Sequence, residues 1–340
     1  MKRLFWLVLV SLMLGLMACS KPVEVKMLSG AAQGTNWHVS VWSDSAIDTE
    51  RLQEEIEAEF LRIDKMMSNY RQDSIIEQFN RSENPLAIEV GEEIVNLVNI
   101  ARQVSQATDG CYDLTVKPLF DLWGFSKDLF NAPSETDIQN VIKKIGLSYL
   151  ASPTQTSLLK KQPELSVDLS SIAQGYSVSR IAKVVESAGI TDYLVEIGGE
   201  MQTRGHKPDG SFWRIAIERP LPGDRAVHKV IDIKTDDSIA IMTSGTYRHY
   251  FDEQGQRYSH ILDARTGKPV THSTLSVTVL HDDPTQADAW STALLCLGES
   301  DAIRVANEYG IAAFIVTEEK GSLIESSSNA WNTMKNIGVN

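Results

Sequence analysis

The chain has 340 residues, 42% of them hydrophobic, and a formal net charge of −13 at pH 7. This length and apolar content suit one large globular domain or two small ones. An acidic chain without a basic run is not expected to bind nucleic acid.

The first residues are typical of a secretory signal. Lys2 and Arg3 precede an apolar run, residues 4–17, that is too short for a comfortable membrane span. The run ends at Ala18-Cys19, which resembles a bacterial lipobox, so we expect Cys19 to be lipidated and to become the new N-terminus. An ordinary signal peptide with an incidental cysteine is the alternative.

These boundaries divide the chain into three parts. Residues 1–18 are the expected lipoprotein signal peptide, 19–26 a lipidated tether and 27–340 the folded domain. Several acyl chains on one cysteine would give a stable membrane anchor. Cys111 and Cys296 remain in the domain. They could pair in an oxidising compartment, but their small-residue contexts favour two unpaired core thiols.

The first half of the domain is predicted to be mainly helical. Alternation in NWHVSVW predicts a strand at 36–42, and a short strand is expected at 166–168. Ser134 and Asp137 form a capping box that opens one helix. Apolar spacing and end signals place the helices of this half at 48–66, 91–108, 134–145 and 171–187.

Strand signals dominate after residue 190. Strands are predicted at 193–199, 212–220, 229–235, 238–245, 275–280 and 312–317, with a hairpin around 253–255. Two further helices are expected at 285–297 and 300–309. Helices and strands come in blocks rather than in strict βαβ alternation, which favours the α+β class.

One predicted helix carries polar residues on a face that otherwise suits a core. Asp288 and Thr292 lie four residues apart in QADAWSTALLCLG, so they share one side of the helix. Thr285 and Asp288 could form a capping box, and Thr292 could bond back to the carbonyl of Asp288. A site for Mg²⁺ is the alternative, because this ion takes few protein ligands and leaves the rest to water and phosphate oxygens.

A second polar stretch, VDLSSIAQGY at 167–176, ends the short strand and opens a helix. Asp168 could act only as a cap of that helix. The free N–H groups that follow could also bind a phosphate. Gly198-Gly199 lacks the full dinucleotide-binding pattern, and no cysteine–histidine cluster has zinc spacing.

The order of such stretches is more specific than any one of them. Eight motifs follow one another: Gly34-Thr35, MSNY, CYDLTVKPLFDLWGF, VDLSSIAQGY, EIGGE, TSGTYRHY, HILDARTG and ADAWSTALLCLG. In this order they resemble the ApbE family of FAD:protein FMN transferases, over about residues 27–320. A lipidated N-terminus also fits this family.

The resemblance implies an α+β, T-fold-like architecture, with mixed or antiparallel sheets packed by helices and FAD bound in a cleft. It implies Mg²⁺-dependent transfer of the FMN half of FAD to a Ser or Thr hydroxyl of an acceptor protein, with release of AMP. Acceptors in the family are subunits of membrane redox complexes of the Nqr or Rnf type. Such an enzyme is expected in the bacterial cell envelope, as a periplasm-facing lipoprotein of the inner membrane.

The resemblance also implies roles for individual residues. His260 matches the proposed catalytic histidine. The side chains of Asp288 and Thr292 and the backbone carbonyl of Ser171 match metal ligands. Contacts to the flavin nucleotide match Gln33, Tyr70, Cys111, Tyr112, Asp113, Asp168, Gln174, Ile261 and Leu262.

Four positions depart from the family's pattern. Gln33 stands where methionine is usual, and Gln174 stands where a charged residue is common. Ala264 replaces a typical proline. Ser291 occupies a position where some members carry an additional acidic metal ligand. We therefore assign Ser291 to the metal site and expect weakened metal affinity.

Two other functions are compatible with these residues. An FAD pyrophosphatase would use water in place of the acceptor hydroxyl and release FMN and AMP from the same metal site. A non-catalytic periplasmic flavin-binding lipoprotein would need neither His260 nor the metal ligands, and their presence argues against it.

Overall fold

The computed structural model describes residues 24–127, 129–221, 223, 226–247, 250–253 and 256–339. The predicted signal peptide, Cys19 and the predicted turn at Gln254-Gly255 lie outside these residues. No helix within the described ranges is long and apolar enough to cross a membrane.

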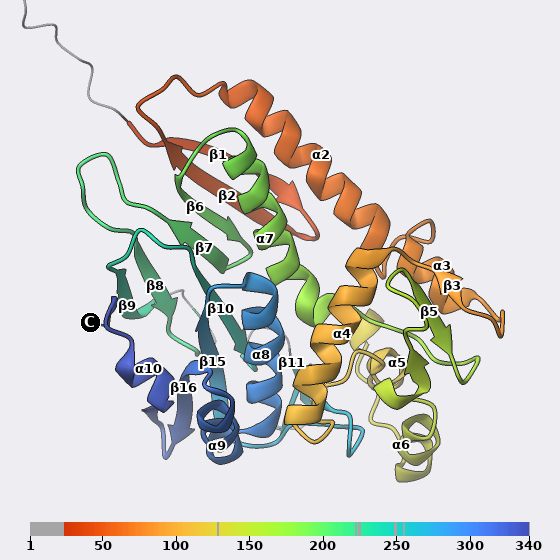
Figure 1. The fold of residues 1–340 in the computed structure, drawn as a ribbon. Coiled ribbons are helices and arrows are strands. Elements are labelled where there is room, and N and C mark those ends of the chain that lie inside the picture. Colours follow the sequence, from red (N-terminus) through yellow and green to blue (C-terminus); the bar gives the residue numbers. More distant parts are fainter. Residues whose placement is uncertain are drawn as a thin grey trace, which may run out of the picture.

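An eight-stranded antiparallel sheet runs through the molecule (Figure 1). In spatial order its strands are β1 (Lys26–Ala32), β2 (Thr35–Trp42), β6 (Asp192–Ile197), β7 (Glu200–Arg204), β10 (Ile239–Gly245), β15 (Thr274–His281), β16 (Ala312–Glu319) and β17 (Ser322–Ser327). Buried positions alternate with more exposed ones along β6, whereas β15 is buried on both faces. The middle of the sheet therefore lies between two covering layers.

One covering layer is a small antiparallel sheet. Its spatial order is β18 (Ile337–Val339), β9 (Val227–Ile233) and β8 (Arg214–Glu218). Apolar side chains of β8 and β9 pack against Ile241, Leu280 and Phe314 of the large sheet and against Trp331 of α10 (Asn329–Thr333). The residues adjacent to these in sequence, such as Met242 and Val279, belong to the core on the other face.

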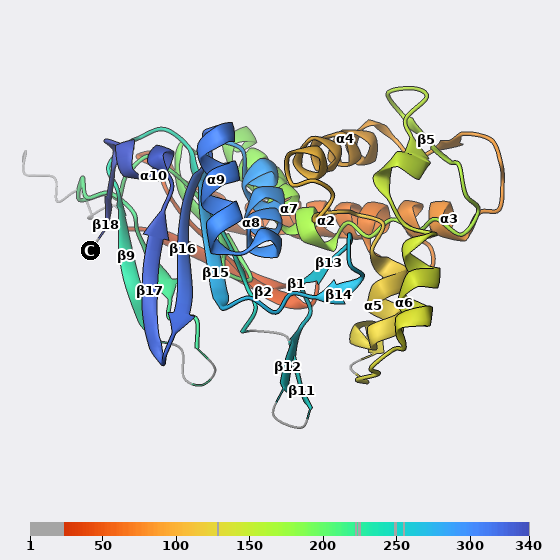
Figure 2. The ribbon, with the colours of Figure 1, turned by 90° about the horizontal axis from the view of Figure 1, so that it is seen from below.

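The other layer is helical. The helices are α2 (Thr49–Met67), α4 (Glu92–Ala107), α7 (Ser170–Ser187), α8 (Pro284–Leu297) and α9 (Glu299–Tyr309), which lie together above the large sheet in Figure 2. Apolar residues of α7 and α8, among them Ile181 and Leu294, are fully buried in the core that they share with the sheet. The contact between α7 and α8 positions Ser171, Gln174, Asp288 and Thr292, which are described below.

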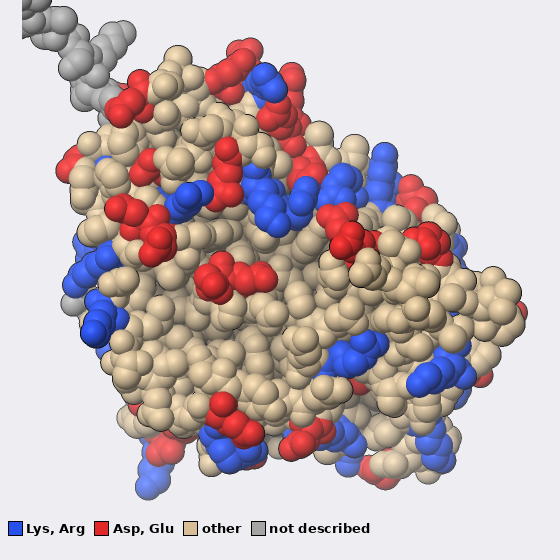
Figure 3. Space-filling view, viewed as in Figure 1, with Lys and Arg blue, Asp and Glu red and all other residues tan. Residues whose placement is uncertain are grey.

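Acidic and basic side chains are intermixed on the helical face (Figure 3). Arg62 lies 2.9 Å from Glu59 and 2.7 Å from Glu93, and Arg180 lies 2.6 Å from Glu59. These ion pairs link α2, α4 and α7. Burial acts to raise the pKa of Glu59, but hydrogen bonds from Arg62 and Arg180 outweigh it and hold the pKa below its usual value.

Two smaller units extend from the same side of the molecule (Figure 2). One is the helix pair α5 (Lys117–Trp123) and α6 (Glu135–Ile142), and the other is the hairpin of β11 (Tyr250–Glu253) and β12 (Gln256–Ser259). Phe125 of the short 3₁₀ helix Phe125–Lys127 stacks on Phe251 of the hairpin, with ring centroids 4.9 Å apart. The remaining elements are α3 (Ile75–Arg81), the 3₁₀ helix Leu147–Tyr149, β3 (Ile88–Glu89), β4 (Leu150–Ala151), β5 (Ser157–Lys160), β13 (Leu262–Asp263) and β14 (Lys268–Pro269).

The α+β prediction is confirmed, and so are the strand at 36–42, the long helices and the hairpin, with small shifts at their ends. The capping box is confirmed as well, because Ser134 accepts a hydrogen bond from the Asp137 N–H at 3.2 Å. The helix it opens ends at Ile142 rather than at residue 145.

The predicted strand at 166–168 is wrong. This segment has no regular secondary structure and pairs with no strand in the part of the chain that is described. Side-chain amides bind its backbone instead: the Val167 carbonyl accepts hydrogen bonds from Asn69 and Asn80, and the Val167 N–H donates to Asn80. Alternation of apolar residues cannot distinguish these partners from a neighbouring strand.

Candidate functional site

A cavity of about 640 Å³ opens beside the amino-terminal end of α7. Segments far apart in the chain form its wall: the loops after α2 and α4, the first turns of α7, the end of β10, the segment after β12 and one side of α8. Twelve predicted site residues line it: Tyr70, Cys111, Tyr112, Asp113, Asp168, Ser171, Gln174, His260, Ile261, Leu262, Asp288 and Thr292.

Asp288 sits where α7 and α8 touch. Its side chain is almost fully buried, and its Oδ2 accepts a hydrogen bond from the Gly175 N–H at 2.7 Å. Gly175 allows this approach, because a Cβ at that position would lie 2.3 Å from the Pro284 carbonyl oxygen and 2.5 Å from Asp288 Cβ. Burial raises the pKa of Asp288 to about 7.

The capping interpretation of this stretch is wrong. Asp283 caps α8 by accepting a hydrogen bond from the Thr285 N–H at 2.8 Å, so Asp288 lies inside the helix. Thr292 Oγ1 lies 2.9 Å from Ser244 Oγ of β10. Asp288 and Thr292 both line the cavity, as their spacing predicted.

Ser291 occupies a different environment from Thr292. It is fully buried, it donates to the Asp288 carbonyl at 2.9 Å, and its Oγ lies 2.8 Å from Ser244 Oγ. It does not line the cavity. In this structure Ser291 therefore contacts Asp288 and Ser244 from the side that faces away from the cavity.

The start of α7 faces the cavity through Ser170 and Ser171. Asp168 Oδ1 accepts a hydrogen bond from the Ser170 N–H at 2.8 Å, although the N-cap residue of α7 is Leu169. Ser171 Oγ donates to the Tyr112 hydroxyl at 3.1 Å. The Ile172 and Ala173 N–H groups donate to the Leu169 carbonyl, so the Ser171 N–H and the positive end of the helix dipole are what this turn offers to an anion.

Asp113 shapes the wall next to Tyr112. Its carboxylate accepts hydrogen bonds from the Thr115 N–H at 2.7 Å and from the Leu147 N–H at 2.9 Å. Burial raises the pKa of Asp113, and these hydrogen bonds partly oppose the increase. The side chain thus holds the loop after α4 against the 3₁₀ helix that follows α6.

Gln174 connects α7 to the turn between β6 and β7. Its Nε2 donates to the Ile197 carbonyl at 2.9 Å. Gly198 in this turn has a φ of +60°, and a Cβ there would lie 2.3 Å from Gln174 Nε2. Gly198 of EIGGE therefore makes room for the Gln174 side chain, which lines the cavity.

Tyr70 and Gln33 mark two edges of the predicted flavin site. Tyr70 lines the cavity with 90% of its surface exposed, so most of its ring is free to meet a ligand. Gln33 is exposed in the turn between β1 and β2, and its Nε2 donates to Ser177 at 2.8 Å. Gln33 is not among the lining residues, and its role in binding flavin stays a prediction.

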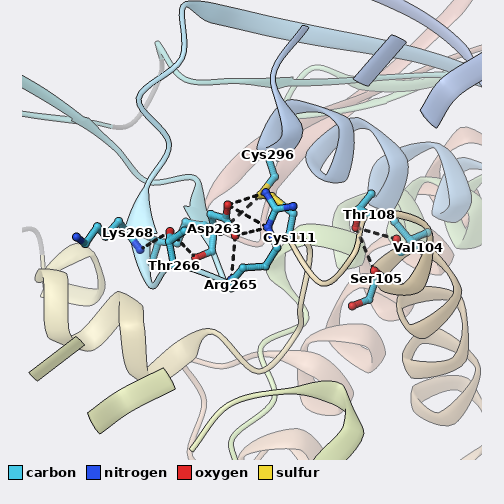
Figure 4. Close-up of a disulfide and its surroundings, with 10 residues drawn as sticks. Val104, Ser105, Thr108, Cys111, Asp263, Arg265, Thr266, Lys268 and Cys296 are labelled. Carbon is cyan, nitrogen blue, oxygen red and sulfur yellow. Dashed lines mark hydrogen bonds and ion pairs between the residues drawn. A yellow bond between two sulfur atoms is a disulfide. The ribbon is translucent and has the colours of Figure 1, made fainter. Parts of the chain in front are cut away.

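The prediction of two unpaired thiols is wrong. Cys111 and Cys296 form a disulfide between residues 185 positions apart in the chain, and both line the cavity (Figure 4). Small neighbouring residues show that a cysteine is buried, but they do not show which other segment packs against it.

Sequence reasoning assigned no role to several lining residues. Glu200 is 7% exposed and accepts a hydrogen bond from the Thr243 N–H at 3.0 Å. Ser244 contacts Thr292, as described above, and Lys117 adds a positive charge to the wall. Glu200, Ser244 and Lys117 lie in the motifs EIGGE, TSGTYRHY and CYDLTVKPLFDLWGF, respectively. The motifs therefore pointed to these segments, but they did not assign a role to these residues.

Comparison with known proteins identifies the family. The family model described as "ApbE family" matches residues 33–315. A FAD:protein FMN transferase of Escherichia coli is 36% identical over 88% of this chain and 86% of that protein. Flavin transferase ApbE from Vibrio cholerae has a TM-score of 0.83 at 34% identity, over 92% of this chain and 99% of that chain. The ApbE protein of Thermotoga maritima has a TM-score of 0.80 at 30% identity, over 91% and 98%. The chain therefore belongs to the ApbE family.

Proposed function

We propose that this protein transfers the FMN portion of FAD to a Ser or Thr hydroxyl of an acceptor protein and releases AMP. One observation carries the proposal: a single cavity brings together His260, the start of α7 and the oxygen-bearing side of α8. The relatives named FAD:protein FMN transferase support the same reaction.

The chemistry assigns tasks to these groups. Transfer breaks the bond between the FMN phosphorus and the bridging oxygen of FAD, and it forms a bond from that phosphorus to the acceptor oxygen. The acceptor hydroxyl loses its proton, and His260 is the group in the wall that accepts it, because imidazole titrates near neutral pH. The Ser171 N–H at the start of α7 binds a phosphate oxygen.

The oxygen atoms of α7 and α8 fit Mg²⁺. Among the described residues no cation lowers the pKa of Asp288, and a buried carboxylate of this kind favours a bound metal ion. Asp288, Thr292 and the backbone carbonyl of Ser171 would hold the ion. When bound, it would stabilise the negative charge that develops on the departing AMP.

We further propose that the domain works at the membrane. Cys19 would carry the lipid, and the tether at 19–26 would keep the cavity on the periplasmic side of the inner membrane. A subunit of a redox complex of the Nqr or Rnf type would present the acceptor hydroxyl there. The lipobox-like sequence and the family resemblance support this placement.

A labelling experiment tests the reaction. The protein is incubated with FAD, Mg²⁺ and a candidate acceptor domain, and flavin fluorescence in a denaturing gel is compared with the amount of AMP. We expect protein-bound flavin and AMP in equal amounts. AMP without bound flavin would identify an FAD pyrophosphatase, and neither product would identify a flavin-binding protein.

A further inference from the structure

The disulfide lies at a junction of the cavity wall (Figure 4). Cys111 belongs to the loop after α4 and Cys296 to the last turn of α8. Both are buried, with exposed fractions of 0% and 4%, and both line the cavity. The bond therefore joins two walls of the site rather than two parts of the outer surface.

Each cysteine is close in sequence to residues with a proposed role. Cys111 directly precedes Tyr112 and Asp113. Cys296 follows Thr292 by four residues and Asp288 by eight, so the three side chains lie along one side of α8. The disulfide thus connects the flavin-binding loop to the helix side that carries the metal ligands.

A third wall segment meets the same point. The Ala264 N–H donates to the Cys111 carbonyl at 3.3 Å, and Cys296 Sγ lies 4.0 Å from the Leu262 carbonyl oxygen. The Asp263 carboxylate lies within 4.8 Å of both sulfur atoms. The segment that begins at His260 is therefore packed against the disulfide as well.

The two ends of α8 are held differently. Near its start, the Gly175 N–H binds Asp288 and so fixes α8 to α7. Near its end, the covalent link to Cys111 fixes it to the loop after α4. These two attachments determine how far Asp288 and Thr292 lie from Tyr112 and Asp113.

We propose that Cys111 and Cys296 are positioning residues for FAD, on the basis of the proposed function. In the oxidised protein their bond holds the flavin-binding loop and the metal-binding side of α8 at the separation that FAD requires. A dithiol reductant transfers two electrons: the S–S bond breaks, each sulfur gains a proton, and the reductant becomes a disulfide. The reduced site then adopts the binding arrangement only part of the time, and its affinity for FAD falls to that fraction of the oxidised value.

The test compares oxidised and reduced full-length protein in detergent. The dissociation constant for FAD is measured by flavin fluorescence in a buffer that holds Mg²⁺ as its only divalent ion, so that the proposed metal site is loaded in both samples. Alkylation followed by mass spectrometry establishes the state of Cys111 and Cys296 in each sample. If the reduced site is competent about a tenth of the time, FAD binds about tenfold more weakly.

Transfer kinetics separate positioning from general stability. Saturating FAD draws the reduced protein back into the competent arrangement, so KM for FAD should rise about tenfold while kcat stays within about twofold. Partial unfolding would instead lower kcat and leave KM unchanged, because fewer molecules would be active. That second pattern would overturn the inference.

Two variants complete the design. Cys111→Ala should bind FAD as weakly as the reduced wild type, and Cys111→Ala/Cys296→Ala should give one dissociation constant with or without reductant. Circular dichroism verifies that each variant is folded. Equal FAD affinity in oxidised and fully reduced wild-type protein would refute the positioning role. Failure of the oxidised protein to bind FAD would contradict the proposed function itself.

Discussion

Asp288 shows how much of the proposed chemistry depends on one side chain. A carboxylate in water is stabilised by many hydrogen bonds, whereas Asp288 is 5% exposed and accepts one from the Gly175 N–H. Burial raises its pKa to about 7, which measures the cost of keeping the charge without a nearby cation. A bound divalent ion would remove that cost.

We predict that Asp288→Asn abolishes most of the transfer activity without unfolding the protein. The asparagine carbonyl can still accept the hydrogen bond from Gly175, so the free energy of unfolding should change by less than about 1 kcal/mol. The transfer rate should fall roughly a hundredfold or more, because a charged metal ligand is lost. FMN transfer at limiting Mg²⁺ and thermal unfolding measure the two effects.

Matched variants make this result specific. Asp301→Asn removes an exposed carboxylate from α9 and should leave the transfer rate unchanged. Thr292→Val removes a neutral oxygen and should act in the same direction as Asp288→Asn, but more mildly. A near-normal rate for Asp288→Asn at limiting Mg²⁺ would show that Asp288 is not a metal ligand.

Single-residue predictions from sequence were reliable where helix periodicity decides the outcome. The four-residue spacing of Asp288 and Thr292 placed both on the cavity side. Ser291 is one position from Thr292, so it points about 100° away around the helix, toward the Asp288 carbonyl. Its assignment to the metal site came from the family resemblance, and the direction in which its side chain points was not considered.

Among the elements, the contact between α7 and α8 is the most constrained. We predict that Gly175→Ala lowers the free energy of unfolding by about 1–3 kcal/mol, because the new Cβ would meet the backbone of Pro284 and force the helices apart. FAD binding should weaken with it. Urea unfolding and FAD titration measure both, and Lys183→Ala on the exposed side of α7 is the control. Unchanged stability would show that the helices repack freely.

The ion pairs between α2, α4 and α7 should make stability depend on pH. The pKa of Glu59 is lowered in the folded protein, so its contribution is fully present above the unfolded-state value of 4.5 and is lost as the pH falls through the folded-state value. We predict that Glu59→Gln lowers the free energy of unfolding at pH 7 by about 1–2 kcal/mol and reduces the loss on acidification. Denaturant unfolding at pH 7 and at lower pH tests this.

Glu54→Gln, which changes an exposed residue of the same helix, is the control for this series. An equal effect of both substitutions would show that general charge, rather than the pairs with Arg62 and Arg180, stabilises the helical layer.

Helices and strands were predictable from the sequence where the local residue pattern determines them. They were not predictable where contacts with a distant segment of the chain determine them. The long helices follow from apolar spacing and caps. The segment at 166–168 also has a strand pattern, but Asn69 and Asn80 occupy its hydrogen-bonding groups. The disulfide likewise depends on the packing of α8 against the loop after α4, which no local signal reports.

For the molecule as a whole, membrane attachment is the main proposal that lies outside the described residues. We predict that Cys19→Ala releases the protein from membranes or blocks its maturation while the folded domain stays active, because in our proposal this one cysteine carries the whole anchor. Membrane fractionation and FMN transfer measure the two effects. Unchanged fractionation would mean that Cys19 is not the lipidated residue.

The long sequence separations within the site also determine when it can form. The hydrogen bond between Gly175 and Asp288 spans 113 positions, and the disulfide spans 185. A chain synthesised from its N-terminus contains Tyr70, Asp113 and Ser171 long before α8 follows. FAD therefore finds no complete binding site early in folding. By mass action it stabilises only the domain that has already folded. FAD binding therefore comes late in folding, after α8 has docked onto α7 and the loop after α4.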